Sequence, residues 1–149
     1  KSTIINFCKR NGIAISDEPV VYHDGISTKR CDIRLVLPTE DVYVDVTIAN
    51  AACKTHAGKP LSTIERNKTR EKEASYLEHV AALNGHLVTF VAEARGTLAP
   101  AALHLCKRLD ALQIVKQKGH IAKEIQTALA RANGSILTNV LRPLLRFRA

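Results

Sequence analysis

Two aspartates and two lysines are the residues whose types and spacing suggest chemistry. Asp32 and Asp45 lie in two short runs of alternating apolar and polar residues, and Lys68 and Lys72 follow at positions one helical turn apart. Two neighbouring carboxylates can share a hard cation such as Mg²⁺, and a lysine beside them can offset charge on a phosphate. Together they supply the groups needed to hydrolyse a phosphodiester.

A β-hairpin is predicted to bring the two aspartates together. Residues 30–37 and 42–49 each alternate with a period of two, and a four-residue turn led by proline separates them. Pairing Leu37 with Val42 places all the apolar side chains of both runs on one face. We therefore expect one buried face and one polar face.

This register also sets the distance between the aspartates. Asp32 and Asp45 fall on the polar face as diagonal neighbours, roughly 7–8 Å apart at the backbone, within reach of one cation. The same register places Arg34 opposite Asp45. A structural ion pair between those two residues is therefore the alternative interpretation of Asp45.

The other elements are predicted from apolar periodicity and from the positions of glycine and proline. Helices are expected over residues 2–10, 63–83, 100–112 and 120–132, with a last basic helix after residue 134, and strands over 20–22 and 86–94. The order αβββαβ is typical of an α/β fold with a mixed sheet flanked by helices. Lys68 and Lys72 then lie on the helix that follows the hairpin.

The chain of 149 residues carries a formal net charge of +8, and the excess is unevenly placed. Residues 1–100 hold 13 basic and 12 acidic side chains, whereas residues 101–149 hold 9 and 2. A basic helical tail over about 114–149 is expected, and a polyanion is its natural partner. A solvated basic helix is the alternative interpretation.

Composition favours one soluble globular domain. Hydrophobic residues make up 46% of the chain, and no apolar run approaches the roughly twenty residues that cross a bilayer, so no membrane partner is expected. The chain begins at Lys1 and contains no methionine, which favours a domain cut from a longer polypeptide. We expect an intracellular location, nuclear if the parent is a eukaryotic element.

The cysteines are too far apart for a structural zinc site. They are Cys8, Cys31, Cys53 and Cys106. Because zinc sites need close pairs and three of the four lie in apolar patterns, buried reduced thiols are expected.

Three short motifs resemble the PD-(D/E)xK nuclease superfamily. They are Arg30-Cys31-Asp32, then Asp45-Val46-Thr47 after twelve residues, and the helical segment 70–76. More narrowly, the chain is similar to the restriction-endonuclease-like domain found beside reverse transcriptases in site-specific non-LTR retrotransposons. The resemblance spans roughly residues 20–135 and implies a restriction-endonuclease-like fold.

The resemblance also implies a set of site residues. Asp32 and Asp45 would ligate Mg²⁺ or Mn²⁺, with the backbone carbonyl of Val46 as a third contact. Thr47 occupies the position of the usual superfamily lysine, and in the retrotransposon-type branch that lysine lies on the next helix, at the position of Lys72. Candidates to support the site or contact DNA are Arg30, Thr47, Lys68 and Tyr76.

The function implied is a metal-dependent DNA endonuclease that nicks target DNA for retrotransposon integration. Attack by water would leave 3′-OH and 5′-phosphate ends. DNA is the implied partner, with a reverse transcriptase module in the same polypeptide. Two alternatives stay open: a nucleic-acid-binding module that has lost catalysis, and a dimeric resolvase-like nuclease acting on branched DNA.

Overall fold

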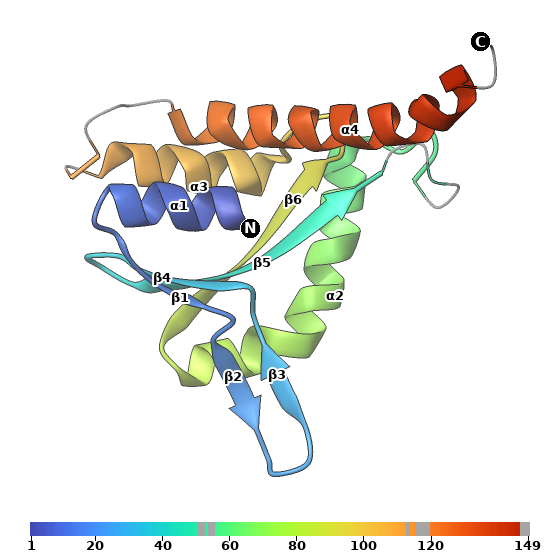
Figure 1. Cartoon of the computed structure of the whole chain (residues 1–149). Helices are drawn as coiled ribbons and strands as arrows, with labels where there is room; N and C mark the ends of the chain where they lie inside the picture. The colour runs from blue at the N-terminus through green and yellow to red at the C-terminus, as the bar shows by residue number, and fades with distance from the viewer. Residues whose placement is uncertain (51–52, 54–55, 113, 116–119, 147–149) are drawn as a thin grey trace.

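The computed structural model describes residues 1–50, 53, 56–112, 114–115 and 120–146, with side chains up to residue 135. Its centre is a mixed four-stranded sheet with helices on both faces (Figure 1). The strands, in spatial order, are β1 (Ala14–Asp17), β4 (Ile33–Val36), β5 (Asp41–Ala49) and β6 (Gly85–Glu93). The pairs β1–β4 and β4–β5 are antiparallel, and β5–β6 is parallel. The predicted α/β class with a mixed sheet is confirmed.

The helices divide unequally between the two faces of the sheet (Figure 1). One face is covered by α1 (Ser2–Arg10), α3 (Pro100–Ala111) and α4 (His120–Arg146), and the other by α2 (Leu61–Ala82). Because β5 and β6 are parallel, the chain must cross over between them, and α2 makes that crossover. Helix α2 is thereby placed against β5 and β6.

The hairpin of β4 and β5 has one apolar face, as predicted. Leu35, Val42 and Val44 are completely buried in the main core. They pack there with residues from all three covering helices, including Ile4, Leu105 and Ile121. The alternate residues of β5 point toward α2.

The hairpin turn is tighter than predicted. Leu37 N donates to Glu40 O over 3.0 Å, so the loop consists of residues 38–39, and the register moves by two residues. Leu35 now pairs with Val42. A shift of two leaves every side chain on its expected face because the side-chain period of a strand is two.

The new register overturns one predicted contact. Arg34 pairs with Tyr43 rather than with Asp45, and its Nε donates to Asp41 Oδ2 over 3.0 Å. The predicted ion pair between Arg34 and Asp45 is therefore wrong. Asp32 also comes to lie one residue beyond the Ile33–Val44 pair, closer to Asp45 along the strands than a diagonal neighbour would be.

The first strand of the main sheet is not the predicted one. Residues 20–22 do form a strand, β2 (Val20–His23), but it pairs with β3 (Thr28–Arg30) in a separate two-stranded sheet. That hairpin projects from the body of the molecule (Figure 1). One edge of the main sheet is formed by β1, whose residues are exposed or half-buried and so give little apolar periodicity.

Within the basic tail, residues 120–146 form one continuous helix, α4, rather than two. Gly134 lies inside α4, where a glycine costs only about 1 kcal/mol relative to alanine. The Asn133 side-chain amide donates to the carbonyl of Ala94, and Ile121 and Ile125 are buried. The first half of α4 is thus part of the core.

Among the described residues, no helix is long and apolar enough to cross a membrane.

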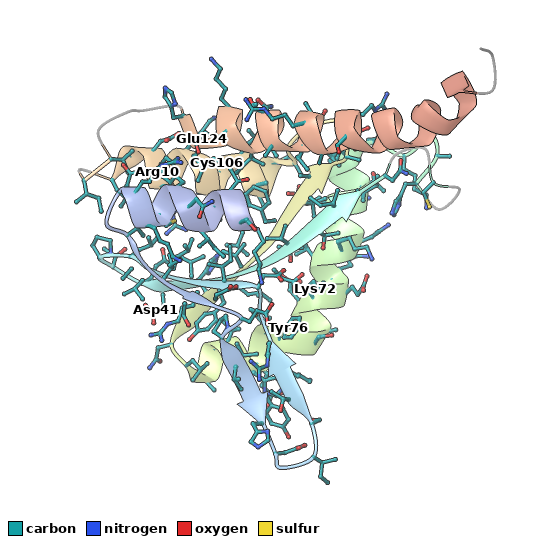
Figure 2. The ribbon with its side chains drawn as sticks, viewed as in Figure 1. Arg10, Asp41, Lys72, Tyr76, Cys106 and Glu124 are labelled. Carbon is teal, nitrogen blue, oxygen red and sulfur yellow. The ribbon has the colours of Figure 1, made fainter. Side chains whose placement is uncertain are left out.

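A surface ion pair joins α4 to α1. Arg10 Nη2 lies 2.6 Å from Glu124 Oε2, and Figure 2 shows both side chains between the two helices, far from Lys72 on α2.

No disulfide involves the buried cysteines, and Cys8, Cys31 and Cys106 are all thiols as expected. Burial raises the pKa of Cys8 to about 11.

Candidate active site

The face of the sheet beneath α2 carries a polar layer between two small apolar clusters. One cluster consists of Val21, Cys31, Tyr43 and Val80, and the other of Ala49, Ile64, Val91 and Ala99. Asp45 lies between them on β5, and Thr89 occupies the registered position beside it on β6. Lys72 reaches this layer from α2. The fold therefore places charged side chains between two packed apolar clusters.

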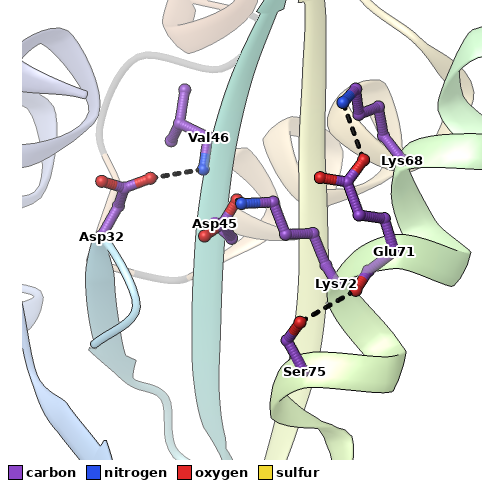
Figure 3. A network of polar contacts seen from close by, with 7 residues as sticks. All are labelled: Asp32, Asp45, Val46, Lys68, Glu71, Lys72 and Ser75. Carbon is purple, nitrogen blue, oxygen red and sulfur yellow. Dashed lines mark hydrogen bonds and ion pairs between the residues drawn. The ribbon is translucent and has the colours of Figure 1, made fainter. Parts of the chain in front are cut away.

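Asp45 and Lys72 form the central ion pair of this polar layer. Lys72 Nζ lies 2.9 Å from Asp45 Oδ2, and the Asp45 side chain is only 7% exposed. Figure 3 shows Lys72 extending from α2 to Asp45, with Asp32 on the other side of Asp45. Asp45 Oδ2 is buried and accepts no hydrogen bond of regular geometry from the described residues. The contact with Lys72 is therefore electrostatic rather than an aligned hydrogen bond.

Asp32 extends the hairpin with both its backbone and its side chain. Asp32 N donates to Val44 O over 3.0 Å, and Asp32 Oδ2 accepts from the backbone N–H of Val46 over 2.7 Å (Figure 3). In an extended strand the N–H and C=O of one residue point to the same side. The carbonyl of Val46 therefore points toward Asp32 rather than toward β6. Both aspartates and this carbonyl meet along one short stretch of β5.

The charges of the ion pair are set by burial and by their neighbours. Burial raises the pKa of Asp45, the Lys72 ammonium opposes that rise, and the Asp32 carboxylate adds to it. Burial lowers the pKa of Lys72, but the contact with Asp45 outweighs it and the net shift is upward. Lys72 is thus a fixed positive charge near neutral pH and not a base. Burial makes the ionised form of the Asp45 carboxyl unfavourable, and a second cation would stabilise that form.

The oxygen donors at this place suit a hard divalent cation. Mg²⁺ is typically held by one or two carboxylates, with water and substrate phosphates in the other positions. Asp32 and Asp45 supply two carboxylates, and Lys72 contacts the Asp45 carboxylate through Oδ2. Within the described part of the chain, no group of three His, Cys, Asp or Glu side chains could hold a metal. Water, phosphate and the carbonyl of Val46 would have to complete the coordination.

The other candidate residues lie at increasing distance from this centre. Tyr76 is half-buried, and its ring centroid is 5.8 Å from Lys72 Nζ. Thr47 is half-buried two residues beyond Asp45 on the same strand face. Lys68 pairs with Glu71 at 2.7 Å on the surface of α2, and Arg30 is exposed at the end of β3. The structure groups Asp32, Asp45 and Lys72, and leaves Lys68 and Arg30 at the rim.

Cys31 contributes packing rather than chemistry. It is buried next to the site, in the cluster with Val21, Tyr43 and Val80. Burial raises the pKa of Cys31 to about 12, and the carboxylates of Asp45 and Asp32 add to the effect. Its sulfur is therefore a protonated thiol.

Sequence reasoning missed Thr89. Its side chain is on the same sheet face as that of Asp45 because registered neighbours on parallel strands share a face. No local sequence pattern distinguishes Thr89, because it lies within an apolar run that is typical of an ordinary buried strand. Only the pairing of β5 with β6 identifies Thr89 as a neighbour of the site.

No model of a known protein family matches this chain, and no curated protein matches it. Its function is therefore inferred from the geometry of the polar layer.

Proposed function

We propose that this domain is a divalent-metal-dependent DNA endonuclease. The observation that carries the proposal is the convergence of Asp32, Asp45 and Lys72 on one stretch of β5. These residues are separated by up to 40 positions in the chain, and a purely structural ion pair would need only two of them. Burying a charged pair is costly, so a site that concentrates two carboxylates and an ammonium points to chemistry.

Each residue has a distinct task in the proposed reaction. Asp32, Asp45 and the carbonyl of Val46 would hold Mg²⁺ or Mn²⁺. When bound, the metal polarises the phosphate and lowers the pKa of a bound water. Lys72, as a fixed cation, offsets the charge that develops on the phosphate oxygens. Tyr76 packs beside the Lys72 ammonium and limits its movement.

DNA is the substrate that the charge distribution favours. Residues 101–149 carry a net charge of +7, from 9 basic and 2 acidic side chains. Exposed basic residues such as Lys123 and Arg131 lie on α4, and Arg30 and Lys68 lie at the rim of the site. These residues would contact phosphates, which gives affinity that weakens with salt rather than sequence specificity. A nick made in this way would leave a 3′-OH able to prime an associated reverse transcriptase.

A nucleic-acid-binding module without catalysis is the second candidate. Two observations favour it: Lys72 already neutralises Asp45, and the described residues supply only two carboxylates at the centre. Such a module would bind DNA without needing Mg²⁺. Metal binding therefore separates the two candidates.

The test is nicking of supercoiled plasmid by the purified domain in Mg²⁺ or Mn²⁺. Asp45→Asn should lower the rate about a thousandfold, because a catalytic metal contributes several kcal/mol and each 1.36 kcal/mol is a factor of ten. Asp41→Asn is the matched control, since Asp41 lies on the same strand but pairs with Arg34 at the surface. Plasmid left intact by the unmodified domain, or cut equally by Asp45→Asn, would rule out the endonuclease.

A further inference from the structure

Two buried polar atoms that make no regular hydrogen bond with the described residues belong to registered neighbours in the polar layer. Asp45 Oδ2 and Thr89 Oγ1 are both inaccessible to solvent and accept or donate no regular hydrogen bond among the described residues. Asp45 is 5% exposed and Thr89 4% exposed. A third such atom, Asp110 Oδ1, lies on α3 at the other face of the sheet. Asp45 and Thr89, in contrast, both lie in the polar layer under α2.

The sheet register makes these two residues direct neighbours. Asp45 pairs with Thr89 in the parallel ladder between β5 and β6, and neighbouring strands lie about 4.8 Å apart. Their side chains emerge on the same face, under α2. Leaving a buried hydroxyl without a hydrogen-bond partner destabilises the fold, so a valine would be the more favourable residue for packing alone.

We infer that Thr89 is a positioning residue that acts through Asp45. Its hydroxyl donates to Asp45 Oδ2, by rotation about its Cα–Cβ bond or through one enclosed water, and so fixes the carboxylate plane. Lys72 contacts the same oxygen from α2, which leaves Asp45 Oδ1 for the divalent cation. The inference rests on the proposed metal site.

Thr89 suits this role better than the other hydroxyl groups around the site. Thr47 also lies on β5, but it is half-buried and two residues away from Asp45 along the strand. The Tyr76 ring stacks its face toward Lys72 Nζ at 5.8 Å. Thr89 alone among these three combines the registered position with complete burial. Outer groups that orient a ligand typically change metal affinity 10–100-fold when removed.

Thr89→Val is the decisive variant because it keeps the shape of the side chain and removes only the hydroxyl. Titration calorimetry with MnCl₂, without DNA, should show Mn²⁺ affinity lower by about tenfold or more. Thermal unfolding without metal should shift downward only slightly, since the variant loses one hydrogen bond to Asp45 and keeps the packing of the side chain. Thr89→Ser retains the hydroxyl and should keep Mn²⁺ affinity within about threefold of the unmodified chain. Thr127→Val, at an exposed position on α4, controls for the substitution type.

The outcomes separate this inference from the proposed function. Unchanged Mn²⁺ affinity in Thr89→Val, with clear binding by the unmodified chain, overturns the role of Thr89 and leaves the metal site standing. Failure of the unmodified chain to bind Mn²⁺ overturns both. Equal loss of affinity in Thr89→Val and Thr89→Ser would assign the effect to packing and also overturn the inference. The metal midpoint of plasmid nicking should move in parallel with the calorimetric affinity.

Discussion

The two faces of the central sheet are packed differently, since one packs mainly apolar side chains and the other includes a buried ion pair. The face under α1, α3 and α4 packs into one continuous apolar core. The face under α2 has two small clusters with Asp45, Thr89 and Lys72 between them. One strand, β5, contributes to both, because its successive side chains alternate between the faces. The difference indicates that the first face stabilises the fold and the second holds the site in place.

This division predicts which substitutions affect folding and which affect activity. The largest effect on stability should come from the continuous core. Leu105→Ala on α3 should lower the free energy of unfolding by about 2–5 kcal/mol, since Leu105 is 1% exposed and its truncation leaves a cavity. Urea unfolding measures this loss. Nicking per folded molecule should stay near the unmodified rate, and a specific loss of catalysis would contradict the division.

Apart from the loss of a proposed metal ligand, the largest effect on rate should come from Lys72. Lys72→Met keeps most of the aliphatic stem and removes the charge that faces Asp45, so the nicking rate should fall roughly 100-fold. The melting temperature without metal should also fall, because the variant leaves the buried Asp45 carboxylate without its counter-ion, so the rate is compared per folded molecule. Lys9→Met, at an exposed position on α1, is the matched control. A rate for Lys72→Met equal to that of this control would contradict an electrostatic role for Lys72.

A smaller effect should appear in the pH dependence of stability without metal. Because burial raises the pKa of Asp45 above its ordinary value of 3.8, the folded state binds this proton more tightly than the unfolded state. Its contribution is fully present below pH 3.8 and is lost as pH rises through the raised pKa. The Asp45→Asn variant has no carboxyl group at this position, so its stability does not fall in this way as the pH rises. The stability of the variant relative to the unmodified chain should therefore increase across that window and level off above it.

Urea unfolding in EDTA at a series of pH values measures this difference. A stability difference that is constant with pH would show that Asp45 is not destabilised by burial. Adding Mg²⁺ should stabilise the unmodified chain and not Asp45→Asn, because a ligand that binds only the folded state raises its stability.

The smallest effect is expected from the ion pair between Arg34 and Asp41. The Arg34 side chain is 41% exposed, and such pairs contribute at most about 1 kcal/mol. Arg34→Ala should lower the unfolding free energy by less than that and leave nicking unchanged. A larger loss, or any change in metal dependence, would indicate that Arg34 acts on Asp45 after all.

Much of the fold follows from local patterns. The alternation in residues 33–37 and 42–46 determined which side chains are buried, and that assignment survived a two-residue error in register. The register itself depended on whether the turn held two or four loop residues, which proline alone did not decide. Strand β1 was missed because its residues are exposed or half-buried and so show no apolar period.

The sequence by itself determined the residue types at the site: two carboxylates on one strand face and a lysine on the following helix. The tertiary structure decided which charges meet, because the tight turn paired Arg34 with Asp41 and left Asp45 to Lys72. It also placed Thr89 beside Asp45. That contact comes from a parallel pairing across the α2 crossover, and the position of a distant strand is set by packing of the whole domain rather than by local pattern.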